Sequence, residues 1–380
     1  MESSLLYIII ATLTLVTIVI LILCIVIYYA LDARRQGFDV IKRQIDYFSL
    51  VTFIDDKNVT FTPHGDDSKQ YSIPILGIEG KNGHIVSEGG PVRHDIGITR
   101  SISSLNGDIR KGSRVRTDLF VYESDPETSL GLDYEEIKFD SELGELDAWV
   151  VPQKSDNWAI FIHGHRSNRR ESLRLTSLFH RLGYNQMLIT YRNDEGAPVD
   201  KGGYHMFGIT EWKDLESAVR YSLNRGAKNI NLVGHSMGGA IVLKFLLESR
   251  LSDQISKIIL ESPALDLNRI ISAKAANLPF PASTFLLPVK KMVSRIVGFN
   301  WSELNYLENT NKYNVPILLI HSETDDTVPV ILSDEFAISR PDIIEYVRLH
   351  NAPHAAAWNF HRNKIEKSIE SFLVRSHQKS

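Results

Sequence analysis

The pattern of apolar and polar positions divides the chain into three stretches of different character. The first stretch holds no charge from Ser3 to Leu31, and from Leu5 to Leu31 it is apolar apart from three threonines. About 20 apolar residues are enough to cross a bilayer as a helix. The pattern therefore predicts a transmembrane anchor over residues 1–36, with the membrane span at about residues 5–31.

A cleaved signal peptide is the alternative interpretation of this first stretch. Such a peptide has a positively charged start, a shorter apolar run and small residues at its cleavage site. Here the chain begins with Met-Glu-Ser-Ser, the apolar run is too long, and no Ala-x-Ala pattern closes it. We therefore expect the span to be retained.

Positive charge flanks the predicted span on one side only. The residues that carry it are Arg34, Arg35, Lys42 and Arg43, and no Lys or Arg precedes the span. Because positively charged flanks favour the cytoplasmic side, we expect a single-pass protein of the cell membrane with its body in the cytoplasm. Residues 32 to about 48 mix polar and apolar positions and are predicted to form a juxtamembrane helix.

The second stretch, from residue 50 to about 128, alternates short apolar runs with clusters of Gly, Asp, Asn and Pro. Short strands separated by turns give this pattern. We expect strands at Val51–Ile54, Tyr71–Ile78, His84–Val86, Ile96–Ile102 and Leu119–Val121. Residues 37–130 are thus predicted to hold the juxtamembrane helix and a small β-rich module, in which we identify no catalytic motif.

The third stretch, residues 131–380, alternates apolar strands with helical patterns. The predicted strands are Glu136–Phe139, Ala148–Val151, Ala159–Ile162, Gln186–Tyr191, Ile230–Val233, Lys257–Leu260, Pro316–Ile320 and Glu345–Leu349. Helical patterns such as Glu211–Leu223 and Gly239–Glu248 lie between them. Near-continuous apolar strands alternating with helices are typical of an α/β fold with a mostly parallel sheet covered on both faces.

One segment, residues 266 to about 314, interrupts this alternation. It contains no clear strand and places Pro279, Pro281 and Pro288 among Leu, Phe, Val and Met. Its most apolar part is Leu278–Pro288. We interpret the segment as an inserted helical lid.

Composition and charge bound the partners of the protein. The chain has 380 residues, of which 43% are hydrophobic and 23% charged, as in ordinary globular proteins. Its formal net charge of −4 provides no overall basic field for nucleic acid. Four arginines cluster with Glu171 on what is interpreted as a solvated helix start; they are Arg166, Arg169, Arg170 and Arg174. We therefore expect no nucleic-acid partner, and the single cysteine excludes an intramolecular disulfide.

The motif Gly234-His-Ser236-Met-Gly238 carries the first chemical signal. It matches G-x-S-x-G, in which the serine stands on a tight turn between a strand and a helix. The apolar run Asn229–Val233 leads into the motif and a helical run from Gly239 to Leu247 follows it. We predict Ser236 as a nucleophile; the alternative is a glycine-rich turn with an incidental serine.

A serine hydroxyl needs a base, and in a fold with this motif the acid and the histidine follow the serine along the chain. The strand Pro316–Ile320 is followed by Glu323, Asp325 and Asp326, which are all candidate acids. Because they come directly after the carboxyl end of a strand, they are placed at the same rim as Ser236.

The predicted base is His354, on the loop after the strand Glu345–Leu349. His350 lies nearer the strand end and is expected to be structural. The spacing of four between these histidines would suit metal ligands, but no acidic or cysteine pattern completes a site, so we expect no metal.

An oxyanion hole needs two backbone N–H groups directed at the charge that develops on the substrate oxygen. One is expected from Met237, the residue after the nucleophile. The other is expected from His165, in the loop His163-Gly164-His165 after an earlier predicted strand. The side chains of both loop histidines are left without an assigned role.

Together these motifs resemble the α/β-hydrolase superfamily, in the branch of membrane-linked, serine aminopeptidase-like and lysophospholipase-like members. The matching motifs lie between about Leu132 and Val374; they are His163-Gly164, Tyr191-Arg-Asn193, Gly234–Gly239, Asp325-Asp-Thr-Val-Pro329 and Pro353-His354. The resemblance implies a mostly parallel central sheet flanked by helices, with a lid. It also implies that the aspartate of D-x-x-V-P, Asp325, is the acid of the triad.

The segment Tyr191–Pro198, with Thr210-Glu-Trp212, is similar to a subset of this family that carries a β-rich N-terminal module. The chain departs from many relatives at Asn193-Asp-Glu195, where a glycine-rich turn is usual. The role of that loop is left open.

The expected function is a serine hydrolase that cleaves an acyl ester, of a small molecule or a lipid, through Ser236, His354 and Asp325 and an acyl-enzyme intermediate. No cofactor is expected, and the membrane is contacted through the N-terminal helix. A serine peptidase or aminopeptidase using the same triad is one alternative. A non-catalytic membrane-bound scaffold that works through the β-rich module is the other, and the sequence assigns no oligomeric state.

Overall fold

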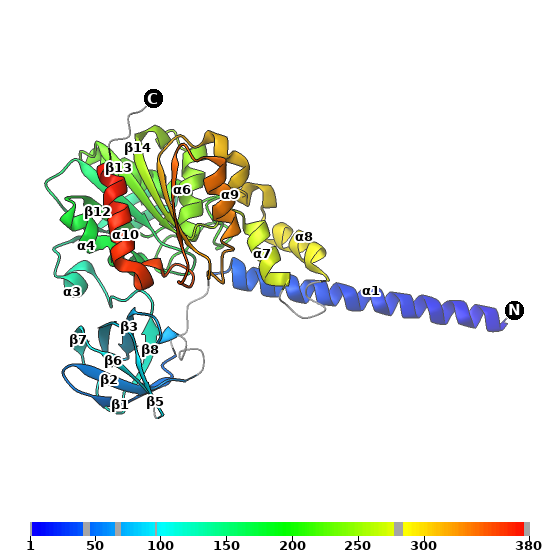
Figure 1. Cartoon of the computed structure of the whole chain (residues 1–380). Coiled ribbons are helices and arrows are strands. Elements are labelled where there is room, and N and C mark those ends of the chain that lie inside the picture. The colour runs from blue at the N-terminus through cyan, green and yellow to red at the C-terminus, as the bar shows by residue number, and fades with distance from the viewer. Residues whose placement is uncertain (1, 41–45, 65–69, 96, 277–283, 376–380) are drawn as a thin grey trace.

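The computed structural model describes residues 2–40, 46–64, 70–95, 97–276 and 284–375. Two β-sheets lie side by side, and a long N-terminal helix projects away from the larger one (Figure 1). The smaller sheet is built from the first third of the chain and the larger one from the rest.

The N-terminal helix α1 runs from Glu2 to Gly37. Residues 4–24 are exposed all round, whereas Val26 and Ala30 are buried against the body of the protein. Its three threonine hydroxyls donate to backbone carbonyls one turn earlier, so these polar groups are satisfied within the helix. Among the described helices, this one is long and apolar enough to cross a membrane, by length and composition.

The juxtamembrane helix predicted for residues 32 to about 48 is wrong as a separate element. Residues 32–37 are the last turns of α1 itself, and residues 38–40 and 46–48 are not helical. Residues 41–45 lie outside the described residues.

The smaller sheet is antiparallel and eight-stranded, in the order β5-β6-β2-β1-β8-β3-β4-β7. Its strands are β1 Ser49–Ile54, β2 Asn58–Thr62, β3 Ile75–Gly80, β4 Gly83–Glu88, β5 Val92–His94, β6 Gly97–Ser101, β7 Ser104–Gly107 and β8 Arg114–Asp118. Alternate positions such as Val59, Phe61, Ile78 and Ile85 pack into its core. The strand predicted at Leu119–Val121 is wrong, because β8 ends at Asp118 and these residues form the turn that leaves the sheet.

The larger sheet also has eight strands, in the order β16-β15-β14-β13-β11-β12-β10-β9. Its strands are β9 Glu135–Ser141, β10 Gly144–Val151, β11 Asn157–Ile162, β12 Asn185–Ile189, β13 Asn229–His235, β14 Ile255–Glu261, β15 Ile317–Ser322 and β16 Ile344–Leu349. The strands β9 and β10 pair antiparallel and the others run parallel from β12 to β16. The prediction of a mostly parallel sheet is confirmed.

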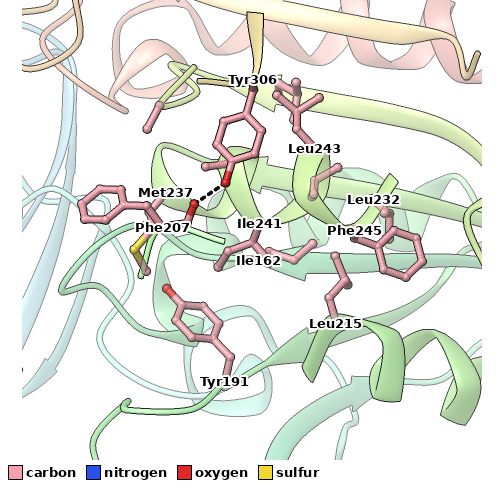
Figure 2. Close-up of a cluster of buried hydrophobic side chains, with 14 of the residues drawn as sticks. Ile162, Tyr191, Phe207, Leu215, Leu232, Met237, Ile241, Leu243, Phe245 and Tyr306 are labelled. Carbon is pink, nitrogen blue, oxygen red and sulfur yellow. Dashed lines mark hydrogen bonds between the residues drawn. The ribbon is translucent and has the colours of Figure 1, made fainter. Parts of the chain in front are cut away.

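Helices cover both faces of this larger sheet. The elements on one face are α5 Trp212–Asn224, α6 Met237–Glu248 and α9 Ile331–Ser339; on the other they are α4 Leu173–Arg181 and α10 Ala357–Val374. Short elements complete the body: α3 Pro126–Leu130, η1 Arg169–Ser172 and η2 Ser252–Gln254. Figure 2 shows the packing of the first face, where Leu215, Leu232 and Ile241 meet between α5, β13 and α6.

The segment predicted as a lid is helical where it is described. It contains α7 Leu267–Ala276, α8 Leu286–Val297, η3 Trp301–Leu304 and η4 Leu307–Lys312. Residues 277–283, which include the first six residues of the apolar stretch Leu278–Pro288, lie outside the described residues. The helix α8 packs alongside α1 near the body of the protein (Figure 1). An isolated bridge between Asp266 and Asn305 closes the base of the insertion.

Candidate active site

Ser236 lies on the sharp turn between β13 and α6. Its φ of +51° and ψ of −113° fall in a region that side chains rarely adopt. The turn requires glycines on either side, since a Cβ at Gly234 would lie 2.8 Å from the backbone of Gly238, and one at Gly238 would meet the carbonyl oxygen of Ile162. The strand-to-helix setting predicted for the G-x-S-x-G motif is therefore present, and it holds the serine hydroxyl at the carboxyl end of the sheet.

His354 stands beside this hydroxyl on the loop that follows β16. The Ser236 hydroxyl donates to His354 Nε2 over 2.8 Å, and Nδ1–H of the same ring donates to Asp325 Oδ2 over 2.7 Å. The three side chains come from three different loops at one end of the sheet. The structure thus brings together the serine, histidine and aspartate that the sequence singles out.

Asp325 is fixed on both of its oxygens. Its Oδ1 accepts the backbone N–H groups of Thr327 and Val328, each over 2.8 Å. Burial alone would raise the pKa of this carboxyl, but the hydrogen bonds from His321 and His354 hold the pKa well below its usual range. Asp325 is therefore an ionised acceptor for the imidazole at neutral pH.

The two other candidate acids point elsewhere. Glu323 is exposed and pairs with Arg348 and His350, while Asp326 is exposed and accepts the hydroxyl of Thr327. His350, expected to be structural, is bonded through Nδ1 to Glu323 over 3.0 Å. Of the three acids, Asp325 alone contacts His354 among the described residues.

His321 is a contributor that the sequence analysis did not identify. It lies at the end of β15 with a fully buried ring, its Nε2–H donates to Asp325 Oδ2 over 3.1 Å, and its Nδ1 accepts the Ser333 hydroxyl over 2.7 Å. The signal was its spacing of four before Asp325, which brings both side chains to the same loop. His321 and His354 thus donate to the same oxygen of the Asp325 carboxylate.

Near Ser236, the backbone N–H groups of Met237 and His165 are among those without an acceptor in the described part of the chain. The neighbouring N–H of Gly164 is already taken, because it donates to Glu171 Oε2 over 2.7 Å. Gly164 also lies against the nucleophile, since a Cβ there would stand 3.2 Å from the Ser236 Cβ. These positions fit the two donors predicted for an oxyanion hole.

A buried network holds the His163–His165 turn in place. His163 Nδ1–H donates to the Gly164 carbonyl over 3.0 Å, and its Nε2–H donates to Asp194 over 2.9 Å. Asp194 also accepts the N–H of Tyr191, whose ring stacks on His163. Burial lowers the pKa of His163, but the adjacent Asp194 carboxylate outweighs this and raises it. The loop at Asn193-Asp-Glu195, left open by the sequence, therefore supports this turn.

The arginine cluster interpreted as a solvated helix start is in part an internal support, which corrects that interpretation. Arg174 is buried, and its guanidinium donates to the carbonyl of Ala355 over 2.7 Å and to Asn359 over 2.8 Å. These bonds tie α4 to the loop that carries His354. Arg166 donates to the carbonyl of Arg35 over 2.5 Å and so joins the turn beside Ser236 to the end of α1.

The His165 side chain faces the space above Ser236. Burial, and secondarily the neighbouring His205, lower the pKa of His165 to about 3. Its ring packs edge-on against His205 and tilted against Phe207, at 5.0 and 5.2 Å between centroids. Its imidazole is consequently neutral and behaves as part of an apolar wall.

A pocket of about 530 Å³ opens above Ser236 and His354. Its lining is mainly apolar and comes from α7, α8, the end of α1 and the loops beside Ser236. Cavities of this size suit one small organic ligand. Among the described residues no group of three or more His, Cys, Asp or Glu side chains is arranged to hold a metal ion.

Comparisons with known sequences place the chain near hydrolases. Residues 208–298 match the family model described as serine aminopeptidase, S33. The chain is 25% identical over 228 residues to the uncharacterized protein YqkD of Bacillus subtilis, covering 59% of this chain and 73% of that protein. It is 26% identical over 196 residues to the lysophosphatidylserine lipase ABHD12 of Danio rerio, covering 47% of this chain and 45% of the lipase. The chain therefore spans less than half of that lipase.

Solved structures give the same picture of the fold. The esterase Pf2001 of Pyrococcus furiosus superimposes with a TM-score of 0.53 at 23% identity, covering 66% of this chain and 95% of the esterase. Est1E of Butyrivibrio proteoclasticus, solved with ferulic acid, superimposes with a TM-score of 0.50 at 17% identity, covering 63% and 98%. At these sequence identities, the structural similarity shows that the larger sheet and its helices have the same fold as these esterases, and nothing beyond the fold.

Proposed function

We propose that this chain, which has the α/β-hydrolase fold, is a serine hydrolase that cleaves an acyl ester through Ser236, His354 and Asp325. The observation that carries the proposal is the hydrogen-bonded series from Asp325 through His354 to Ser236, at the floor of an apolar pocket. The lipase and esterase names of its relatives agree with an ester substrate. A lipid-derived ester is the form that the apolar pocket favours.

In the proposed mechanism, His354 Nε2 takes the proton of the Ser236 hydroxyl as its oxygen attacks the acyl carbonyl. Asp325 fixes the tautomer of the imidazole and stabilises its protonated form. The N–H groups of Met237 and His165 hold the oxyanion; one such donor typically contributes about 3 kcal/mol to lowering the barrier. His354 then returns the proton to the leaving alcohol, and water cleaves the acyl-enzyme by the reverse sequence.

The proposal is tested by a fluorophosphonate probe on the full chain. Ser236→Ala removes the attacking oxygen, so labelling and ester hydrolysis are both expected to disappear. The matched control is Ser104→Ala, which removes an exposed hydroxyl in the smaller sheet and should label like the wild type. Labelling that survives in Ser236→Ala rejects the nucleophile and favours the non-catalytic scaffold.

The peptidase alternative is separated by substrate choice. An aminopeptidase needs an acidic group to bind the substrate amine; among the described lining residues the acid is Asp32, which already accepts a hydrogen bond from Gln36 over 2.8 Å. We expect the full chain to hydrolyse acyl esters faster than aminoacyl amides. The opposite preference assigns the site to peptides.

We also propose that α1 anchors the protein in the cell membrane with the body on the cytoplasmic side. The uncharged run from Ser3 to Leu31 and the basic residues Arg34 and Arg35 after it support this orientation. The protein should stay with membranes after an alkaline wash, and external protease should reach the body in inside-out vesicles only.

A further inference from the structure

The end of α1 forms one wall of the pocket above Ser236. Its lining residues from α1 and the turn that follows it are Tyr29, Asp32, Ala33, Gln36, Gly37 and Phe38. Tyr29, Ala33 and Gly37 are spaced by four and share one face of the helix. The opposite walls are apolar side chains of α7 and α8, among them Ile270, Ile271 and Val289. A helix with the composition of a membrane span thus reaches into the candidate active site.

The helix has two parts with different surroundings. Residues 4–24 are exposed in the described structure. Burial against the body of the protein begins at Ile25 and Val26. The 19 residues from Leu5 to Leu23 would be about 28 Å long at about 1.5 Å per residue, close to the ~30 Å of a bilayer's hydrocarbon core. The free part alone therefore suffices to cross the hydrocarbon, and the buried part begins where the headgroups would lie.

The wall is fixed to the catalytic loops. Arg166, one residue after the proposed oxyanion donor His165, donates to the carbonyls of Arg35 and Asp39 over 2.5 and 3.3 Å. Phe38 stacks on Phe299 with centroids 5.1 Å apart, and its carbonyl accepts the N–H of His205 over 2.8 Å. The helix end is therefore held against the site by hydrogen bonds as well as by packing.

We propose that the space between α1, α7 and α8 is an acyl-chain site, which takes the long chain of an ester lipid directly from the bilayer. The inference rests on Ser236 being the nucleophile, as proposed above. With the ester carbonyl at Ser236, the chain runs between the apolar side chains of α7 and α8 toward Tyr29, where the pocket meets the membrane surface. In Figure 1, α7 and α8 lie on the side of the body from which α1 projects.

The site selects substrates by chain length. Each methylene group that leaves water for an apolar pocket adds roughly fourfold to binding. A short ester reaches Ser236 but leaves the α1 wall untouched, whereas a long chain contacts it. The anchor helix is thus a specificity element of the enzyme.

The first experiment compares two tryptophan variants of the full chain in phosphatidylcholine vesicles. Ala33→Trp fills the pocket from the α1 wall, and Leu31→Trp places the same indole at almost the same depth on the exposed face. The measured quantity is the ratio of kcat/KM for p-nitrophenyl palmitate to that for p-nitrophenyl butyrate. Ala33→Trp should lower this ratio at least about tenfold, as expected when the pocket loses room for two methylenes, and Leu31→Trp should leave it unchanged.

The second experiment locates the chain without relying on activity of a bulky variant. Cys24 is the sole cysteine, so Ala33→Cys and Leu31→Cys in a Cys24→Ala background each carry one thiol. After reaction of Ser236 with hexadecyl fluorophosphonate, the thiol introduced at position 33 should react with maleimide at least about tenfold more slowly, a change of the size expected for access blocked by a bound chain. Ethyl fluorophosphonate, and the thiol at position 31, should show no such protection.

The outcomes separate the two proposals. Equal maleimide reactivity at position 33 after either phosphonate, or equal ratios in the two tryptophan variants, overturns the acyl-chain site while Ser236 stays the nucleophile. A Ser236→Ala protein that is still labelled by the hexadecyl compound overturns the proposed function itself. Protection at both positions indicates general coverage by lipid and also rejects the site.

Discussion

The two sheets of the molecule bury ionisable side chains in different ways. In the smaller sheet Arg100 is 1% exposed and its guanidinium donates to the backbone carbonyls of Tyr71, Ile73 and Pro74. Burial lowers the pKa of Arg100 to about 10. This arginine of β6 thus joins that strand to the residues that precede β3.

In the larger sheet several buried ionisable groups form histidine–carboxylate pairs at the carboxyl ends of strands, beside other buried groups such as the Arg192–Asp214 pair. Three of these pairs are enclosed: His163 with Asp194, His235 with Glu261, and His321 with Asp325. The pair of His354 with Asp325 differs, because the His354 side chain is 19% exposed and reaches a hydroxyl in the pocket. Burial of an ionisable pair by itself therefore does not distinguish the candidate site; the partly exposed His354 in front of a buried acid does.

The variant with the largest expected effect on activity is Asp325→Asn, which tests whether the pair of Asp325 with His354 differs from the enclosed pairs in function. The amide keeps the shape but favours the wrong imidazole tautomer, for which losses of about 10⁴-fold in kcat are typical. Asp326→Asn, one residue further on and exposed, is the control and should retain wild-type kcat. Ester hydrolysis and the rate of fluorophosphonate labelling are the measurements. A loss below about tenfold in Asp325→Asn would mean that His354 is oriented by another group.

A second change addresses the smaller sheet. Arg100→Met keeps much of the length but removes the donor from two buried carbonyls, of Tyr71 and Ile73, and from the partly buried carbonyl of Pro74. Each buried group that loses its donor costs about 1–3 kcal/mol. We expect this sheet to be destabilised by about 3 kcal/mol or more, with kcat unchanged while the chain is folded. Hydrogen exchange in β3 and β6 and ester hydrolysis at low temperature test this, with the exposed Arg110→Met as control. A fall in kcat in the folded variant would tie the smaller sheet to the active site.

A third change concerns the junction of the two sheets. Asp118, at the end of β8, is 5% exposed, pairs with Arg170 of the larger body and lies 3.4 Å from His84. Burial opposes ionisation of Asp118, but His84 and Arg170 outweigh it and lower its pKa from 3.8 to about 2. The folded pKa is below the unfolded one, so this stabilisation is present above pH 3.8 and is lost as the pH falls toward 2.

Asp118→Asn should therefore be less stable than the wild type by about 2 kcal/mol at neutral pH, and the difference should shrink between about pH 4 and about pH 2. Urea unfolding across this range measures it, with Asp108→Asn, an exposed carboxylate, as the control. A difference that does not depend on pH would show that the pair stabilises through packing instead of charge.

Much of the larger sheet and its site could be predicted because the pattern is local. Strands such as β13 and β15 are buried on both faces and are consequently nearly continuous apolar runs, and Ser236 and Asp325 stand just after them. His354 follows the edge strand β16, which is only partly buried. The strands of the smaller sheet were harder to predict, because some of them, such as β5 and β7, are only three or four residues long and exposed. Their pairing depends on partners distant in the sequence.

The supporting residues were missed for a related reason. Glu171 and Asp194 accept hydrogen bonds from Gly164 and His163 only because the fold brings them together. The residues next to them in the sequence give no sign of these contacts. The contact of α1 with the body of the protein could not be predicted from the sequence. In an all-apolar helix, residues that face lipid and residues that face protein are of the same types. Val26 and Leu23 differ in burial but not in character.

The continuous helix between the free part of α1 and the pocket has a kinetic consequence. A flexible linker would let the body sample many heights above the bilayer, whereas here no glycine or proline interrupts the helix between Leu23 and Gln36. In the proposed arrangement the pocket mouth is held at headgroup level at all times. Turnover then follows the mole fraction of substrate in the leaflet instead of its bulk concentration, so diluting the substrate with inert lipid slows the enzyme even when the total amount of substrate is constant.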